Sequence, residues 1–251
     1  MIYYQTYGQK QSQAVVLLHS GGMAGEEWHP QIDSLAGRFH VLIPDLPGHG
    51  KSPLHSERLS VRLMAEAVLD MLDAENLYEV NICGSSMGGA VALWLALNHP
   101  TRIKRLVIYR IGYRTNPDIH SQVNAMGDPT YWESFGLAAW LAKLHTPQGG
   151  KDAWKTVIAR VGDALHGDDT QHMHHLNSLA AIRCPTLIIA GDRDPLAPLA
   201  DMLNMYRTIP DAALWIIPHA AHITATNTWR APAFTEELRR FFSREATKKT
   251  P

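Results

Sequence analysis

The sequence is poor in cysteine and nearly balanced in charge. Two cysteines occur among 251 residues, which excludes the disulfide framework of a small secreted protein, and no CxxC or zinc-like spacing is present. Cys83 ends one apolar run and Cys184 precedes another, so we expect both to be small buried side chains. Lysine and arginine number 23, and aspartate and glutamate 24. This balance gives no electrostatic reason to expect nucleic acid or an anionic membrane as a partner.

Long apolar runs and targeting signals are also missing. No apolar run approaches the ~20 residues that a membrane helix needs. Residues 1–5 have neither the basic region nor the apolar region of a signal peptide, so we expect a cytoplasmic protein. The run His-Met-His-His at 172–175 looks like a metal patch, but no acidic or cysteine partners complete a ligand set. We therefore expect a solvated helix face there, and no metal.

Short apolar runs that alternate with helical patterns are what the chain does contain. These runs are apolar on successive residues and rich in Val, Ile and Leu, which is typical of strands buried on both faces. They lie at 14–19, 39–44, 80–84, 105–110, 185–190 and 213–218, with 2–7 as an edge strand. Helical patterns follow Ser60, span 88–98 and close the chain around 234–242. The alternation predicts an α/β fold with a mainly parallel central sheet and helices on both faces.

Residues 111–177 break this rhythm because they contain no convincing strand. Helical patterns cover 132–145 and 152–166, and Pro147 and Gly149 separate them. We predict a helical cap at 111–177, inserted into a core domain made of 1–110 and 178–251. Ligands of open α/β sheets bind at the carboxyl ends of the strands, so a cap at that end would roof a binding site.

The segment 84–89, Gly-Ser-Ser-Met-Gly-Gly, follows an apolar run and opens an alanine-rich helix. It is a G-x-S-x-G nucleophile elbow in the strand-turn-helix context that this motif requires. The serine of such a turn is strained, and side chains at the flanking glycines would collide with the neighbouring strand and helix. Ser86 is therefore the predicted nucleophile, placed at a helix N-terminus where negative charge is stabilised. Ser85 occupies the x position and is expected to be structural.

Four further motifs accompany the elbow in a fixed order. They are His-Ser-Gly-Gly at 19–22, Asp-Leu-Pro-Gly-His-Gly-Lys-Ser at 45–52, Gly-Asp-Arg-Asp at 191–194 and His-Ala-Ala-His at 219–222. With these motifs the chain resembles the α/β-hydrolase fold family over nearly its whole length. It looks like the branch that holds small carboxylesterases, enol-lactonases, cofactor-free haloperoxidases and C–C bond hydrolases.

The resemblance implies a Ser-His-Asp triad, because a serine hydroxyl is a poor nucleophile without a base within hydrogen-bond reach. The family places the acid and then the histidine on loops after core strands. The second acid of the Gly-Asp-Arg-Asp turn matches Asp194, and Asp192 is the alternative. The family histidine matches His222 rather than His219, although the glycine that often precedes it is Ala221 here.

The resemblance also implies an oxyanion hole made of two backbone N–H donors. Met87, directly after the nucleophile, is expected to supply one donor, and the loop after the first strong strand the other. Gly21 is the choice by register and Gly22 the alternative, because the usual His-Gly pair is His19-Ser20 here. His19 itself is expected to be a buried, hydrogen-bonded support.

The expected activity is hydrolysis of a carboxylic ester or lactone of a small to medium, partly apolar molecule through an acyl-enzyme. We expect a monomer or homodimer that needs no cofactor. Perhydrolase or haloperoxidase chemistry and C–C bond hydrolysis use the same triad, so the motifs leave them open. A small-molecule sensor that keeps the triad but turns over slowly is an alternative from another class.

The insert and the residues before it carry side chains whose roles stay open. Arg110 and Arg114 could hold a substrate carboxylate in bidentate fashion, but surface pairing or capping is the favoured interpretation. For the aromatic side chains of the insert, packing within the cap is favoured over ligand contact. These are Tyr113, Tyr131, Trp132, Phe135, Trp140 and Trp154.

Overall fold

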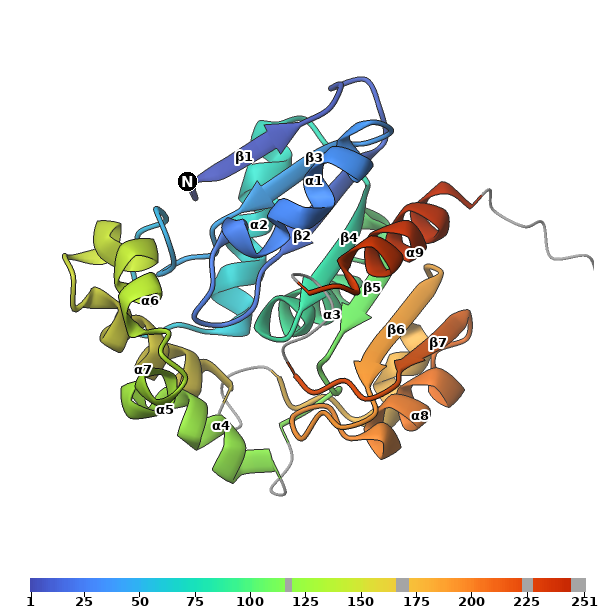
Figure 1. The fold of residues 1–251 in the computed structure, drawn as a ribbon. Helices are drawn as coiled ribbons and strands as arrows, with labels where there is room; N and C mark the ends of the chain where they lie inside the picture. Colours follow the sequence, from blue (N-terminus) through green and yellow to red (C-terminus); the bar gives the residue numbers. More distant parts are fainter. Residues whose placement is uncertain (116–118, 166–171, 223–227, 245–251) are drawn as a thin grey trace, which may run out of the picture.

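The fold is built on one central sheet. The structure is a computed structural model that describes residues 1–115, 119–165, 172–222 and 228–244. Within these ranges seven strands form the sheet in the order β1-β3-β2-β4-β5-β6-β7 (Figure 1). The strands are β1 (Tyr4–Tyr7), β2 (Ala14–Leu18), β3 (His40–Pro44), β4 (Val80–Ser85), β5 (Ile103–Tyr109), β6 (Thr186–Gly191) and β7 (Ala212–Ile217). Only β1 pairs antiparallel, with β3, so the predicted mainly parallel α/β fold is confirmed.

Helices cover both faces of the sheet, and this explains the unbroken apolar runs. Alternate residues of a central strand enter two different hydrophobic clusters, as Ile82 and Cys83 of β4 do. One face is covered by α2 (Val61–Ala74), α3 (Met87–Asn98) and α8 (Leu199–Thr208), and the other by α1 (His29–Ala36) and α9 (Ala231–Ser243). Cys83 is fully buried and Cys184 partly buried, and both thiols are free.

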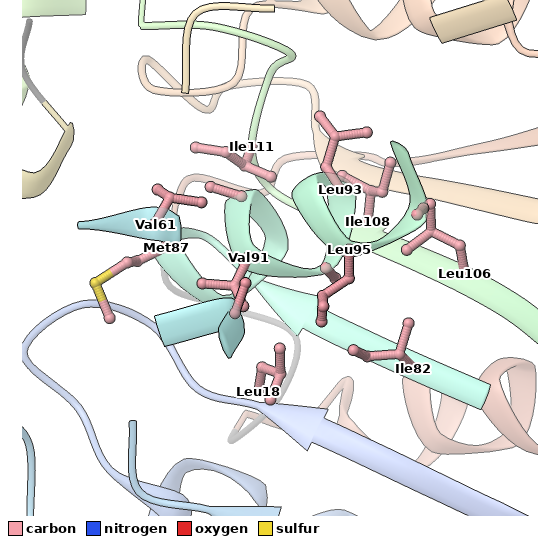
Figure 2. Close-up of a cluster of buried hydrophobic side chains, with 14 of the residues drawn as sticks. Leu18, Val61, Ile82, Met87, Val91, Leu93, Leu95, Leu106, Ile108 and Ile111 are labelled. Atoms are coloured by element: carbon pink, nitrogen blue, oxygen red, sulfur yellow. The ribbon is translucent and has the colours of Figure 1, made fainter. Parts of the chain in front are cut away.

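Helix α3 is buried on nearly all sides against the centre of the sheet. Figure 2 shows Val91 and Leu95 of α3 in one cluster with Ile82 of β4 and with Leu106 and Ile108 of β5. Helix α2 packs against α3 on the same face of the sheet, and most residues of α3 are buried, so α3 has no wide solvent-facing stripe. The turn that joins β4 to α3 is therefore held between two well-packed elements.

Helices α4 to α7 lie in the chain between β5 and β6, and in space beyond the carboxyl ends of the strands (Figure 1). They are α4 (His120–Gly127), α5 (Pro129–Ser134), α6 (Ala138–His145) and α7 (Ala153–Leu165). The sequence predicted one helix over 132–145, but Gly136 has a φ of 71° and separates α5 from α6. Helix α4 was not predicted. The division into a core and a cap at 111–177 remains a prediction.

These four helices have a small hydrophobic cluster of their own. Trp132, Leu141, Trp154 and Ile158 form it, so both tryptophans take part in packing between these helices. Phe135 and Trp140 do not join the cluster, because both are exposed at the surface. Helices α4 and α7 cross at two glycines, and a Cβ added at Gly162 would lie 3.3 Å from Cα of Gly127. Small residues at this crossing let the two helices approach closely.

The His-Met-His-His segment at 172–175 is not the solvated helix face that the sequence suggested. Met173 forms an isolated antiparallel bridge with Arg114, and the side chain of His172 is fully buried. Among the described residues, no cluster of three or more His, Cys, Asp or Glu side chains could hold a metal ion. Across all the residues that the structure describes, no helix is both long enough and apolar enough to cross a lipid bilayer.

Candidate active site

Ser86 lies on the sharp turn between β4 and α3, with φ 51° and ψ −117°. Such a conformation costs a non-glycine residue about 1–3 kcal/mol and persists only where the surroundings enforce it. A Cβ at Gly84 would lie 2.1 Å from the carbonyl oxygen of Gly88, and one at Gly88 would lie 2.5 Å from that of Leu18. The two glycines are therefore required by the close approach of helix α3 and strand β2, as the sequence predicted.

The structure brings Ser86, His222 and Asp194 together from three distant loops. Nε2 of His222 lies 3.0 Å from Oγ of Ser86. On the other side of the ring, Nδ1 of His222 lies 2.9 Å from each carboxylate oxygen of Asp194. All three side chains are buried. The predicted triad residues thus form one hydrogen-bonded chain at the carboxyl ends of the strands.

The geometry also separates the two aspartates of the turn after β6. Asp194 accepts a hydrogen bond from the backbone N–H of Leu196 at 2.9 Å, which fixes the carboxylate that faces His222. Asp192 is exposed and accepts a hydrogen bond from the backbone N–H of Ala220 at 3.1 Å. Asp192 therefore supports the histidine loop, and Asp194 is the partner of the ring.

Burial lowers the pKa of the His222 imidazole below its ordinary value of 6.5, although the hydrogen bond to Asp194 acts in the opposite direction. A neutral ring can donate from Nδ1 to Asp194 and accept the Ser86 hydroxyl proton at Nε2. The arrangement therefore favours the tautomer that a general base needs at neutral pH.

The loop after β2 distinguishes the two candidate oxyanion donors. The N–H of Gly22 donates to Nε2 of His49 at 3.2 Å, so this donor is already engaged. The N–H of Gly21 has no hydrogen-bond partner within the described residues, and Gly21 lines the pocket beside Ser86. The N–H of Met87 opens helix α3, where backbone donors lack partners within the helix. Both observations favour Gly21 and Met87, as the sequence suggested.

Three buried histidines hold this loop in place. His19 donates from Nδ1 to the carbonyl of Ser20 and accepts at Nε2 from the N–H of Leu46, so its expected supporting role is confirmed. Burial lowers the pKa of His19 and lowers that of His49 further. Neutral rings suit these contacts, because each ring donates from one nitrogen and accepts at the other.

His145 is the third histidine, and sequence reasoning missed it. It comes from helix α6, donates from Nε2 to the carbonyl of Gly22 at 2.9 Å and accepts at Nδ1 from the N–H of Gly50 at 3.1 Å. Burial lowers its pKa as well. A lone histidine on a short helix carries no sequence signal for such a contact.

Arg110 is neither a surface residue nor a free cation, which corrects the favoured interpretation. Its side chain is buried, and Nη2 lies 2.6 Å from Oε1 of Glu27. Nε donates to Oγ of Ser85 at 2.8 Å, so Ser85 is structural and belongs to a buried polar network. Arg114, by contrast, is exposed and lies over the ring of Tyr113.

A pocket lies between Ser86 and helices α4, α5 and α7, and its empty space is about 650 Å³ when the part open to solvent is included. Its walls are mainly apolar, and Trp132 is the aromatic side chain that reaches it from the described part of the insert. The lining residues are Ser20, Gly21, Met23, Ser86, Arg110, Ile111, Thr115, Ile119, Val123, Met126, Gly127, Trp132, Val161, Gly162, Leu165, Leu196 and His222. A ligand in this pocket would touch both the sheet edge and the inserted helices.

Comparisons with known proteins agree with this architecture. A family model described as alpha/beta hydrolase fold matches residues 13–135. The putative carbamate hydrolase RutD of Caulobacter sp. (strain K31) is 30% identical over 269 residues, which covers 98% of this chain and 97% of that protein. The chain belongs to the α/β-hydrolase superfamily.

Two further proteins, one similar in sequence and one similar in fold, are also named as enzymes. The 3-oxoadipate enol-lactonase 1 of Acinetobacter baylyi (strain ATCC 33305 / BD413 / ADP1) is 30% identical, covering 78% of this chain and 77% of that enzyme. MGS-M2, an alpha/beta hydrolase enzyme from a Medee basin deep-sea metagenome library, shares the fold with a TM-score of 0.81 at 22% identity. That match covers 100% of this chain and 97% of the other. The comparisons support a hydrolase of this family.

Proposed function

We propose that this α/β hydrolase is a serine esterase or lactonase that cleaves a small to medium molecule with an uncharged, apolar acyl group. The observation that carries the proposal is the hydrogen-bonded chain from Ser86 through His222 to Asp194 at the base of an apolar pocket. The relatives named above, a putative carbamate hydrolase and a 3-oxoadipate enol-lactonase, support hydrolysis as the type of reaction.

In the proposed reaction Ser86 attacks the substrate carbonyl while Nε2 of His222 takes its proton. Asp194 holds the ring in the required tautomer and stabilises the imidazolium that forms. The N–H groups of Gly21 and Met87 bind the oxyanion of the tetrahedral intermediate. His222 then protonates the leaving group, and water, activated by the same ring, hydrolyses the acyl-enzyme.

The pocket supports an uncharged acyl group. Its walls are mainly apolar, so an anionic acyl chain would lose its hydration without gaining a free partner. Among the residues that the structure describes, Arg110 is the cation that lines it, but Glu27 already balances this charge. A substrate whose acyl chain ends in a carboxylate would therefore bind poorly.

The test uses p-nitrophenyl esters of increasing acyl length and a fluorophosphonate probe that reacts with activated serines. We expect ester turnover by the wild type and covalent labelling of the peptide that contains Ser86. The Ser86→Ala variant should lose both, with turnover falling on the order of 10³- to 10⁶-fold. Ser56→Ala, which removes an exposed hydroxyl, serves as the control and should behave as wild type.

Wild-type rates in the Ser86→Ala variant would overturn the proposed nucleophile. Esters that raise the melting temperature of the wild type but are not turned over would contradict the enzymatic proposal and favour a sensor.

A further inference from the structure

We propose that Arg110 is a positioning residue that fixes the three loops of the proposed active site relative to one another. The inference rests on the proposed function, since it concerns the same triad. Arg110 follows strand β5 directly and is buried, with a backbone φ of 51°. A buried arginine in a left-handed conformation is strained and costly, so its surroundings must compensate for it.

The guanidinium of Arg110 contacts each loop through a different nitrogen. Nη2 donates to Oγ of Ser20, in the loop that carries the proposed oxyanion donor, at 2.6 Å. Nε donates to Oγ of Ser85, directly before the proposed nucleophile, at 2.8 Å. Nη1 donates to the backbone carbonyl of His222 itself. One planar group thus touches the oxyanion loop, the elbow and the histidine loop.

Glu27 completes the network and balances its charge. Its Oε1 accepts from Nη2 of Arg110 at 2.6 Å and from Oγ of Ser20 at 2.9 Å. Its Oε2 accepts from the backbone N–H of Ser20 at 2.7 Å. Glu27 lies on the short 3₁₀ helix Gly25–Trp28 and is buried. The oxyanion loop is therefore held by both members of a buried ion pair.

A fixed fork of donors explains why arginine, and not lysine, suits this position. Guanidinium has five N–H donors in one plane, and the contacts described use four of them. Arg110 therefore has one donor left and no uncompensated charge for a substrate carboxylate. Lysine has a single nitrogen and cannot reach three separate loops at once.

The test compares Arg110→Met and Arg110→Lys with Arg105→Met. Arg105 is a matched control because it too is a buried arginine. It lies within β5, near the end of the strand opposite Arg110, and donates to the carbonyl of Arg244. We expect Arg110→Met to lower kcat on a short p-nitrophenyl ester by about 10²-fold, with KM nearly unchanged, because a misplaced reactive group slows the reaction step. Arg110→Lys should recover only a small part of this loss.

The pH profile supplies a readout that a purely structural role would not move. Within the described part of the chain, the charged groups that act on the pKa of His222 are Asp194, Arg110 and Glu27. The charge of Glu27 raises this pKa, whereas that of Arg110 lowers it. Glu27→Gln keeps the shape of the side chain but removes its charge. The pKa of His222 should then fall, and the acidic limb of kcat/KM should move to lower pH. Arg105→Met should leave that limb in place.

The outcomes separate this inference from the proposed function. Fluorophosphonate labelling of Ser86 in the wild type tests the nucleophile alone. If labelling succeeds and folded Arg110→Met keeps kcat within about threefold of wild type, the positioning role is wrong although the hydrolase stands. An equal loss of kcat in Arg105→Met, or an acidic limb that Glu27→Gln does not move, also overturns it. If Arg110→Met does not fold, Glu27→Gln and Arg110→Lys decide the question.

Discussion

Nε2 of His145 lies 2.9 Å from the carbonyl oxygen of Gly22, and this hydrogen bond ties helix α6 to the loop that carries the proposed oxyanion donor. Helix α7 reaches the same loop, because a Cβ at Gly21 would lie 2.3 Å from Cγ1 of Val161. Helices α6 and α7 therefore both contact the backbone that would stabilise the transition state.

His145→Ala should lower both stability and turnover. The change leaves the carbonyl of Gly22 and the N–H of Gly50 buried without their partner, which costs about 1–3 kcal/mol for each group. Thermal unfolding and kcat on a p-nitrophenyl ester measure the two effects. His145→Gln keeps one donor and one acceptor and should recover part of each loss. Lys143→Ala, on the exposed side of α6, is the control. A His145→Ala variant with the kcat of the wild type would show that catalysis does not need the hydrogen bond between His145 and Gly22.

Asp194→Asn should lower kcat on the order of 10³- to 10⁴-fold without unfolding the protein. The amide can donate to Nδ1 of His222, which stabilises the tautomer that carries its proton on Nε2 and cannot accept from Ser86. Asp192→Asn is the matched control, because Asp192 accepts a hydrogen bond from the backbone N–H of Ala220 in the same loop, and this variant should lose far less activity. The reverse order of losses would transfer the acid role to Asp192.

The pH dependence of kcat/KM should show an acidic limb with its midpoint below pH 6.5. Burial lowers the pKa of His222 from 6.5, and the ring acts as a base only when neutral. Activity should therefore rise as pH increases through this lowered pKa and stay high near neutrality. Rates on an ester that does not ionise in this range, with circular dichroism to confirm folding, give the midpoint. A midpoint above 6.5 would show that desolvation does not dominate at this ring.

The charge of the acyl chain should decide which esters are accepted. Mono-p-nitrophenyl adipate carries a terminal carboxylate, whereas its methyl ester has the same chain without charge. We expect kcat/KM for the charged ester to be lower by about 10²-fold, because the carboxylate must be desolvated beside apolar walls. Equal values for the pair, or a preference for the acid, would mean that Arg110 does receive a carboxylate.

Replacing His172 by leucine should stabilise the protein, most strongly in mild acid. Within the described residues both ring nitrogens of His172 are buried without hydrogen-bond partners. Burial lowers its pKa to about 3 from 6.5, so the unfolded chain takes up a proton that the folded chain resists. Stability is therefore lost as pH falls from about 6.5 towards about 3, and His172→Leu removes this loss.

Urea unfolding of the His172→Leu variant at pH 7 and pH 5 measures this difference. The gain should be larger at pH 5. His55→Leu, which replaces an exposed histidine, should show no such pH-dependent gain. A destabilised His172→Leu protein at both values would show that the imidazole makes contacts that leucine cannot replace.

Local sequence determined the strands, the elbow and the order of the proposed triad. Unbroken apolar runs are a property of neighbouring residues, and each run became a strand within a few residues of its predicted limits. The glycines around Ser86 are likewise a local feature, because the tight turn leaves no space for a Cβ at these positions. The order of motifs then pointed to Asp194 and His222, which the fold brings within hydrogen-bond distance of one another and of Ser86.

Only the tertiary structure decided how the loops around Ser86 are held. Arg110 and Glu27 are 83 positions apart, and His145 and Gly22 are 123 apart. Neither spacing leaves a pattern in the chain, because a hydrogen bond between distant segments depends on which side chains the packed sheet and helices bring within about 3 Å. For the same reason the sequence did not predict the burial of two further residues. Arg110 was expected at the surface but is the buried centre of a polar network, and His172 was expected to be solvated but is buried.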